Sequence, residues 1–280
     1  VESTVDTLKE LSIGYMSQIQ CPIISITGSN GKTTTKELLS HILGFYKKIM
    51  CTAGNYNSTI GLPISIFAIA GDEDFCVLEM GASEPNEIAE LCRIAQPTMG
   101  LITNISASHT ENFGSLENVA KAKSDLFTCL PNDGTAFVNI DDNYISKFST
   151  HANRVTYGFK SDADFIGDFN DGVLKINNNV ILLPYTSEIM AKNVLATFAI
   201  ANTIGISHSE IEKSINTFAS PSGRCDIMIH NEITIIDDTY NSNLESAKAG
   251  IDILSEYKGN QKIAIIGDML ELGGLAEDHH

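Results

Sequence analysis

The stretch that most constrains the fold of this chain is residues 23–43, where a strand, a glycine-rich turn and a helix follow one another without a break. Residues 23–26 form a short apolar run, and helical spacing puts Leu38, Leu39, Ile42 and Leu43 on one face of the helix expected at residues 33–43. A strand that passes through a tight turn into a helix lays that helix against its own sheet, and the next parallel strand returns by a crossover. The stretch therefore predicts an α/β fold built on parallel strands.

The same alternation continues along the chain. Buried strands are predicted at residues 75–80, 99–103 and 135–139, and helices at residues 84–94, 120–130, 191–203 and 211–218. Residues 162–185 instead contain short strands separated by turns rich in asparagine and glycine, which predicts an antiparallel hairpin added to the sheet. Together these patterns predict a P-loop-type, doubly wound and mostly parallel sheet.

A second unit is expected near the carboxyl end. Turn residues cluster at residues 219–223, and a new series follows with strands at 225–229 and 233–237, a helix at 244–257 and a strand at 262–266. We therefore expect a first domain at residues 1–220 and the start of a Rossmann-like domain at residues 221–280.

Composition excludes several classes of partner. The net charge of −17, from 18 basic and 35 acidic residues, disfavours nucleic acid and anionic membranes because both require a positive surface. No apolar run approaches the roughly 20 residues that span a bilayer, so we expect a cytoplasmic location without membrane insertion. The six cysteines show no paired spacing, which favours buried free thiols over a zinc site or a disulfide framework.

Because the chain is acidic overall, a polyanionic ligand would need a locally positive binding site, and the turn after the first strand provides one. It consists of Gly28, Ser29, Asn30, Gly31, Lys32, Thr33 and Thr34, whose backbone N–H groups can surround phosphate oxygens at the positive end of the next helix. Lys32 adds charge for the β and γ phosphates, and the Thr33 hydroxyl suits Mg²⁺. The glycine that opens the regular P-loop pattern would fall at Ile26, so the loop is a shortened variant. We predict ATP and Mg²⁺ as its ligands.

Polar residues at the ends of other strands are further candidates, because ligands of doubly wound sheets bind beyond the carboxyl ends of the strands. Glu79 ends one strand and could reach a metal, and His109 follows another. Lys121 and Lys123 lie on the next helix, and Asp238 follows a strand of the second unit. On spacing alone, a solvated surface position is the simpler interpretation of the histidine and the lysines.

Several segments resemble the Mur ligase family of ATP-dependent amide-forming enzymes. They are residues 26–34, 54–57 with 60–63, 78–82, 103–109, 120–123, 237–243 and 267–273, so the resemblance covers nearly the whole chain. The turn at residues 28–34, called the phosphate loop below, and His109 are shared across the wider family. By contrast, residues 54–57, 237–241 and 267–273 favour the branch that adds D-alanyl-D-alanine to UDP-N-acetylmuramoyl-tripeptide in peptidoglycan synthesis.

The resemblance implies catalytic roles that spacing could not assign. Lys32 would hold the ATP phosphates, and Thr33 and Glu79 would ligate Mg²⁺. His109 would ligate a second Mg²⁺ together with Lys123, which matches a lysine that is carbamylated to provide one more oxygen ligand.

The resemblance also implies nucleotide contacts. Asn193 matches an asparagine near the adenine, Arg224 an arginine on the phosphates, and Asp238 an acid near the ribose. Residues 187–190 stand where the family usually carries Gly-x-His-Asn, so the resemblance assigns no adenine contact there.

The implied reaction transfers the γ-phosphoryl group of ATP to the terminal carboxylate of the tripeptide, and the amine of D-alanyl-D-alanine then displaces phosphate. In the family's three-domain plan a domain that holds the UDP moiety would precede Val1, and residues 221–280 would be an incomplete last domain. The alternatives are another Mur ligase, a folylpolyglutamate synthase, a P-loop kinase, or a nucleotide-binding module without catalysis. The diamino acid of the tripeptide and the oligomeric state are not set by the sequence.

Overall fold

The structure, a computed structural model, describes residues 3–107, 110–160, 162–177, 179–183, 187–257, 259, 261–270 and 277. Its first strands are β1 (Ile23–Thr27), β2 (Ile49–Cys51), β3 (Phe75–Glu79), β4 (Met99–Ile102), β5 (Thr135–Asn139), β6 (Asn153–Gly158), β7 (Phe165–Asn170), β8 (Val173–Ile176) and β9 (Asn179–Leu182). The helices that cover them are α1 (Thr4–Met16), α2 (Lys32–Gly44), α3 (Gly61–Ile66), α4 (Glu87–Ala95), α5 (Thr110–Phe113), α6 (Leu116–Thr128), α7 (Glu188–Thr203) and α8 (His208–Ile215).

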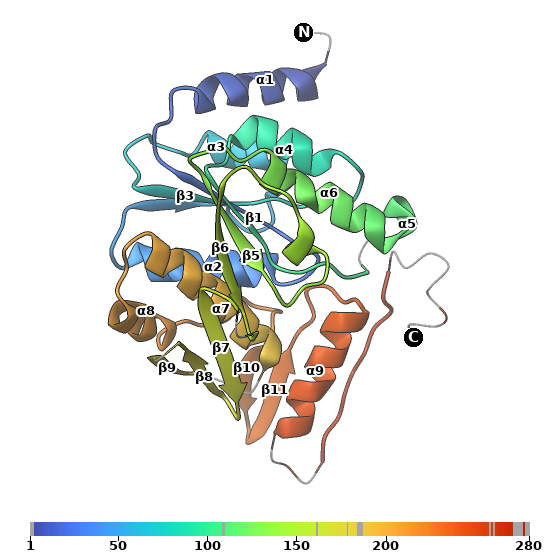
Figure 1. The fold of residues 1–280 in the computed structure, drawn as a ribbon. Coiled ribbons are helices and arrows are strands. Elements are labelled where there is room, and N and C mark those ends of the chain that lie inside the picture. Colours follow the sequence, from blue (N-terminus) through green and yellow to red (C-terminus); the bar gives the residue numbers. More distant parts are fainter. Residues whose placement is uncertain are drawn as a thin grey trace.

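These strands form one nine-stranded sheet in the order β2-β3-β1-β4-β5-β6-β7-β8-β9 (Figure 1). Neighbours from β2 to β7 pair in parallel, whereas β8 and β9 extend the sheet in the antiparallel sense. The predicted α/β fold with a doubly wound, mostly parallel sheet is therefore confirmed, and so is the antiparallel addition.

Two apolar layers enclose the sheet. Helices α1, α3, α4 and α6 pack on one face, and α2, α7 and α8 pack on the other (Figure 1). Within β3, Cys76 and Leu78 belong to the first layer and Val77 to the second, as expected for a strand buried on both faces. Such a strand has a continuous apolar sequence, which is why these runs predicted parallel strands.

Two helices begin at residues other than those predicted. Helix α6 begins at Leu116, before the predicted residue 120, because the Ser115 side chain caps it by accepting a hydrogen bond from the Asn118 N–H. Apolar periodicity does not register this cap, which depends on a single serine hydroxyl. Helix α4 begins at Glu87, after the predicted residue 84, because Asn86 adopts a left-handed backbone conformation with φ of 68°.

The C-terminal unit comprises β10 (Asp226–His230), β11 (Ile233–Asp237) and α9 (Leu244–Glu256). The two strands pair only with each other, antiparallel, among the residues described. The predicted strand at residues 262–266 is wrong: this segment is extended but pairs with no described strand, and Ile265 is 96% exposed. Apolar, β-branched residues favour extended backbone, but a strand forms only where a neighbouring backbone provides hydrogen bonds.

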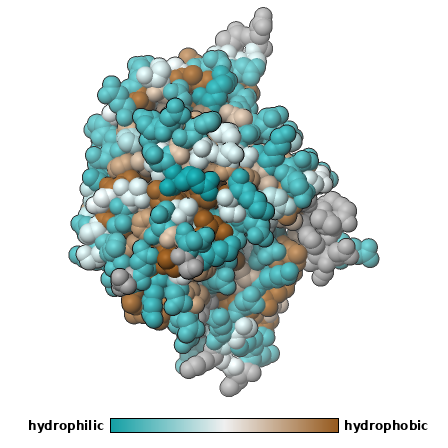
Figure 2. All heavy atoms as spheres, viewed as in Figure 1, coloured by the Kyte–Doolittle hydropathy of each residue, from teal (hydrophilic) through white to brown (hydrophobic). Residues whose placement is uncertain are grey.

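The surface reflects this arrangement. Figure 2 shows a mostly hydrophilic face with apolar patches, one of them over α9 and the extended segment after it, where Ile251, Ile263 and Ile266 are exposed. None of the helices in the described part of the chain is long and apolar enough to cross a bilayer.

Candidate functional site

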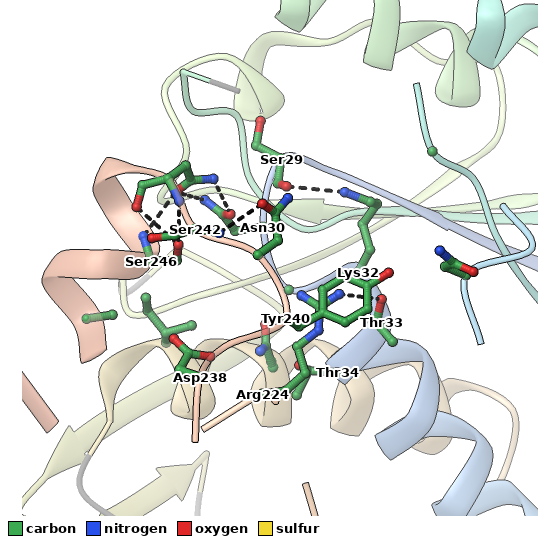
Figure 3. Close-up of a pocket in the computed structure, with 18 of the residues that line it drawn as sticks. Ser29, Asn30, Lys32, Thr33, Thr34, Arg224, Asp238, Tyr240, Ser242 and Ser246 are labelled. Carbon is green, nitrogen blue, oxygen red and sulfur yellow. Dashed lines mark hydrogen bonds between the residues drawn. The ribbon is translucent and has the colours of Figure 1, made fainter. Parts of the chain in front are cut away.

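A cavity of about 530 Å³ lies beyond the carboxyl ends of β1 and β3 (Figure 3). The phosphate loop, the segments after β2 and β3, the start of α7 and the C-terminal unit all contribute to its lining, among others with Lys32, Thr33, Asn57, Glu79, Asn193, Arg224, Asp238 and Tyr240. This volume is in the range of small-molecule and cofactor sites. The structure therefore brings most of the predicted site residues into one cavity, although they come from both ends of the chain.

Two glycines shape the phosphate loop. At Gly28, with φ of 146°, an added Cβ would lie 1.9 Å from Oγ1 of Thr103. At Gly31, with φ of 78°, it would lie 2.8 Å from Oδ1 of Asn193. Both positions combine a backbone conformation that disfavours other residues with a neighbour too close for a side chain.

The segment after β4 holds the loop in place. Backbone N–H groups of Ser29 and Asn30 donate to the carbonyl and the side-chain oxygen of Asn104, at 3.0 and 3.1 Å. The Thr103 hydroxyl donates to the Asn30 carbonyl at 2.6 Å. Helix α2 then starts at Lys32 after a glycine N-cap, so no side-chain cap from the described residues covers its first-turn N–H groups. They remain available to an anion.

Lys32 folds back over the loop. Its Nζ donates to the Gly28 carbonyl at 2.9 Å and to the Ser29 carbonyl at 3.2 Å. Figure 3 shows the second of these bonds. Burial lowers the pKa of Lys32, although the negative charge of Glu79 opposes this shift. The amine therefore lies at the site, and its hydrogen bonds to described residues go to backbone carbonyls that an anionic ligand could replace.

Glu79 lies beside the loop, at the end of β3. Its Oε1 accepts hydrogen bonds from Asn57 Nδ2 at 2.6 Å and from the Thr33 hydroxyl at 3.3 Å. Its Oε2 is buried and accepts no hydrogen bond from any residue that the structure describes. A buried carboxylate oxygen with an unused lone pair beside a hydroxyl is the hard oxygen donor set that Mg²⁺ prefers, so these residues fit that ion.

Lys123 is buried on α6, whereas Lys121 on the same helix is exposed. Burial lowers the pKa of Lys123 to about 7, and the nearby charge of Lys32 adds to the shift while Glu87 opposes it. Lys123 does not line the cavity itself, but it lies close enough to Lys32 for the two charges to interact. His109 lies outside the described residues.

The C-terminal unit contributes the other side of the cavity. Arg224 Nη2 donates to the Thr33 hydroxyl at 3.3 Å, and the guanidinium carbon lies 3.8 Å from the centroid of the Tyr240 ring (Figure 3). Its buried Nε donates to no acceptor in the described part of the chain. Asp238 accepts the Cys225 N–H at 3.1 Å, and burial raises the pKa of the Asp238 carboxyl.

The start of α7 forms the remaining wall. Asn193 is buried there, and its side chain lies directly against Gly31. Ser187 is the N-cap of the helix and accepts the Met190 N–H at 3.3 Å, so its hydroxyl serves the helix rather than an open site. Ile189 and Met190 also line the cavity. This wall of the cavity therefore combines apolar side chains with the polar Asn193.

Sequence reasoning missed Lys36. Its side chain is fully buried, and its Nζ donates to the carbonyls of Thr52 and Gly54, at 2.7 and 3.1 Å, while pairing with Glu37 at 2.7 Å. These carbonyls begin the segment that carries Asn57 to Glu79. No sequence signal distinguished Lys36 from a surface lysine, because its acceptors are backbone atoms from another segment.

The sequence placed Asn243 only within the family-like segment 237–243 and assigned it no role of its own. Asn243 caps α9 by accepting the Ser246 N–H at 3.0 Å, and its Nδ2 also donates to Oδ1 of Asn30 at 2.6 Å. The C-terminal unit is thus bonded directly to the phosphate loop.

Comparison with known proteins agrees with this geometry. Residues 26–205 match the family model of the Mur ligase middle domain. A UDP-N-acetylmuramoyl-tripeptide–D-alanyl-D-alanine ligase of Synechocystis is 32% identical over 100% of the chain, which spans 62% of that relative's length.

Solved structures agree as well. MurF from Acinetobacter baumannii superposes with a TM-score of 0.92 at 27% identity, over 100% of this chain and 64% of its own. A MurF ligase from Thermotoga maritima in complex with ADP gives 0.90 at 28%, over 100% and 67%. The chain thus spans less than two thirds of the curated relative. Its sequence, its fold and the phosphate loop at the carboxyl end of β1 lead to one conclusion: the chain belongs to the Mur ligase family.

Proposed function

We propose that this protein is an ATP-dependent ligase that adds D-alanyl-D-alanine to UDP-N-acetylmuramoyl-tripeptide. The observation that carries the proposal is the buried Oε2 of Glu79, which lacks a hydrogen-bond partner among the described residues and lies next to the phosphate loop. Burying a charged oxygen without a partner costs free energy, which suggests that a cation normally completes the site. The names of the relatives supply the two substrates.

ATP would lie with its phosphates on residues 28–34 and its base against α7, near Asn193. Lys32 would exchange its bonds to the loop carbonyls for bonds to the β and γ phosphates, and the free Nε of Arg224 would donate to a phosphate oxygen. Asp238 would accept a ribose hydroxyl. Thr33 and Glu79 would hold Mg²⁺, which when bound neutralises phosphate charge during transfer.

Lys123 would carry a carbamate. Its pKa of about 7 leaves much of the amine neutral near pH 7, and a neutral amine can attack CO₂. The new N–C bond forms as one amine proton leaves to solvent, so a neutral nitrogen base becomes an oxygen anion. Together with His109, that carbamate would hold a second Mg²⁺.

The reaction itself would need positioning more than a protein nucleophile. The tripeptide carboxylate would accept the γ-phosphoryl group, and the amine of D-alanyl-D-alanine would displace phosphate from the acyl phosphate. A division into residues 1–220 and 221–280, a further domain for the UDP moiety and a cytoplasmic location are part of the same proposal.

The test measures phosphate release by the purified product of the gene. Release should require ATP, UDP-N-acetylmuramoyl-tripeptide and D-alanyl-D-alanine together. Release with a UDP-linked dipeptide plus lysine or diaminopimelate would assign the protein to another Mur reaction, and release with a folate plus glutamate would assign it to folylpolyglutamate synthesis. ADP binding without any release would leave a nucleotide-binding module and reject the ligase.

A matched pair of variants tests the carbamate. With ¹³C-labelled bicarbonate, a carbamate carbon signal should appear in the NMR spectrum of the unmodified protein and of Lys121→Met. The signal should be lost in Lys123→Met, together with phosphate release. A signal that survives Lys123→Met would remove Lys123 from the site.

A further inference from the structure

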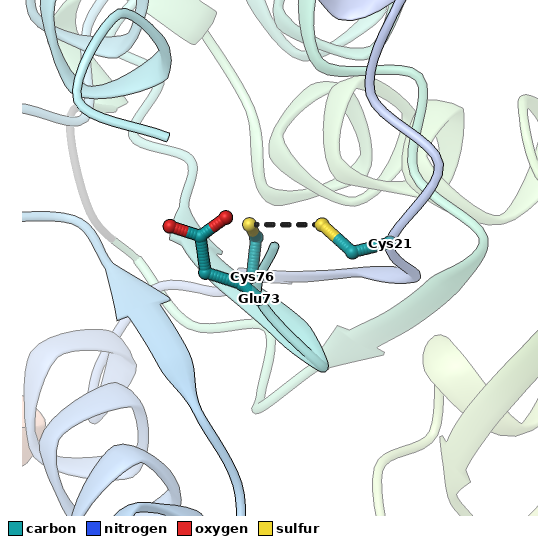
Figure 4. A group of neighbouring side chains, drawn as sticks. All are labelled: Cys21, Glu73 and Cys76. Carbon is teal, nitrogen blue, oxygen red and sulfur yellow. Dashed lines mark hydrogen bonds between the residues drawn. The ribbon is translucent and has the colours of Figure 1, made fainter. Parts of the chain in front are cut away.

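A second group of side chains that could bind a ligand lies at the amino ends of the central strands, whereas the phosphate loop lies at their carboxyl ends. Cys21 precedes β1, Cys76 is near the amino end of β3, and Glu73 lies in the turn before β3 (Figure 4). The two sulfur atoms are 3.3 Å apart. Both sulfurs and a Glu73 carboxylate oxygen lie within 4.8 Å of one another, and no other set of histidine, cysteine and acidic residues does so in the described part of the chain.

We propose that Cys21, Cys76 and Glu73 bind a thiophilic divalent cation of the Zn²⁺ and Cd²⁺ class. Zinc–sulfur bonds of about 2.3 Å in tetrahedral geometry place two sulfurs roughly 3.8 Å apart. The observed separation of 3.3 Å requires a small widening to reach that distance. A disulfide would require the sulfurs to close to about 2.0 Å, which is a larger movement. Two thiolates, one carboxylate and a water would complete four ligands.

The backbone already orients these ligands. The Cys76 N–H donates to the Pro22 carbonyl at 3.0 Å, which ties β3 to the residue next to Cys21. Glu73 Oε1 accepts the Ala70 N–H at 2.9 Å, and Oε2 accepts the Gly71 N–H at 2.8 Å. Each oxygen keeps a second lone pair for a metal, and such outer hydrogen bonds are what orient carboxylate ligands in metal sites.

The exposure of the three ligands to solvent and the protonation of the two thiols determine which cations can bind. Cys76 is buried, whereas Cys21 and Glu73 are partly exposed, so an ion can enter from solvent. Burial raises the pKa of both thiols, so each is protonated near neutral pH. Binding forms two metal–sulfur bonds and releases two protons to solvent, without a change of oxidation state. This exchange requires a metal with high affinity for thiolate, which excludes Mg²⁺ and Ca²⁺.

The site would act as a structural link. It joins the amino ends of β1 and β3, whose carboxyl ends carry the phosphate loop and Glu79. A bound cation would therefore stabilise the central strand pair without taking part in the chemistry at the carboxyl ends of these strands.

The test uses the full chain, freed of metal by a chelator and kept reduced, and titrated with Cd²⁺. Thiolate-to-cadmium charge-transfer absorption should appear in the ultraviolet and saturate, and the melting temperature should rise. Cys21→Ser should abolish the absorption, and Glu73→Gln should weaken Cd²⁺ binding about tenfold or more. Circular dichroism checks that both variants fold, which their partly exposed positions favour.

The matched control is the double variant Cys92→Ser and Cys129→Ser, which removes another pair of neighbouring thiols. It should keep the absorption and the melting shift. Absorption that persists in Cys21→Ser, or that vanishes in the control, would overturn the proposal. So would a reduced protein that gives no absorption with Cd²⁺ at millimolar concentration.

Discussion

Gly31 lies where the phosphate loop meets α7, and its missing side chain makes their contact possible. Its φ of 78° and the 2.8 Å approach of Asn193 Oδ1 to an added Cβ are two separate constraints. Gly205 allows the effect of backbone conformation to be measured separately from that of crowding. Its φ is 95°, but an added Cβ would meet no described atom within 4 Å.

Gly31→Ala and Gly205→Ala should both lower the free energy of unfolding by about 1–2 kcal/mol through backbone strain. Gly31→Ala should in addition weaken ADP binding by about tenfold or more, since the methyl group displaces Asn193 or the loop. Urea unfolding and calorimetric titration with ADP measure the two effects. Equal ADP affinity in the two variants would contradict a role of this contact in nucleotide binding.

Lys36 is a buried cation whose acceptors are two backbone carbonyls and Glu37. Lys36→Met keeps the volume but leaves the carbonyls of Thr52 and Gly54 without their donor. The free energy of unfolding should fall by about 1–3 kcal/mol, as for other buried groups left unsatisfied. Lys121→Met, at an exposed site on α6, should change it by less than about 0.5 kcal/mol. Similar values for the two variants would show that Lys36 is dispensable.

Lys123 makes stability depend on pH. Its pKa is about 7 in the folded chain and near 10.5 in the unfolded chain, so between these values the unfolded chain binds more protons. Stability must therefore rise with pH across this window, by at most about 1.4 kcal/mol per pH unit. In CO₂-free buffer, chemical unfolding from pH 7 to 9 should show this rise for Lys121→Met and for the unmodified protein, but a smaller one for Lys123→Met. Parallel curves would contradict the lowered pKa.

At the scale of elements, α9 is joined to the phosphate loop through its own N-cap. Asn243 accepts the Ser246 N–H while its amide exchanges hydrogen bonds with Asn30, at 2.6 and 3.3 Å. One side chain thus ends a loop, starts a helix and connects two parts of the molecule.

Two substitutions of Asn243 separate these functions. Asn243→Ser should keep the cap and lose the bridge to Asn30, whereas Asn243→Ala should lose both, at a further cost of about 1 kcal/mol in unfolding free energy. In a double-mutant cycle, Asn30→Ala and Asn243→Ser should be non-additive by about 0.5 kcal/mol or more, since each single variant already loses the same bridge. Purely additive effects of Asn30→Ala and Asn243→Ser would contradict the bridge.

At the scale of the whole molecule, the chain consists of a large sheet with a buried core and a small C-terminal unit with little buried surface. Helices bury the nine-stranded sheet on both faces. In the C-terminal unit, by contrast, Ile253 is the buried residue of α9 among those described. The residues of β10 and β11 are all partly or fully exposed. A two-stranded sheet with one helix has little apolar area to stabilise it.

Amide hydrogen exchange should therefore protect β1, β3 and β4 far more strongly than β10 and β11. Mass spectrometry should show a difference of about tenfold or more in protection, because opening the small unit leaves the main sheet intact. Adding ADP should slow exchange in β10 and β11 if Arg224 and Asp238 contact the nucleotide. Equal protection of the two units without ADP would contradict this expectation.

Local information in the sequence determined much of this protein. Continuous apolar runs specified parallel strands, glycine spacing specified a phosphate loop, and motif likeness assigned the chain to its family, because each signal is carried by neighbouring residues. The strand predicted at residues 262–266 failed because strand formation depends on a partner backbone elsewhere.

Tertiary structure alone decided which polar side chains meet. It buried Lys123 while exposing Lys121, connected Lys36 to the segment after β2, and left Oε2 of Glu79 without a described partner. It also brought Cys21 to 3.3 Å from Cys76, a pair whose separation in sequence hides it from any spacing rule. The physical reason is the same in each case: burial and charge interactions depend on distance in space, and only the packing of sheet and helices sets that distance.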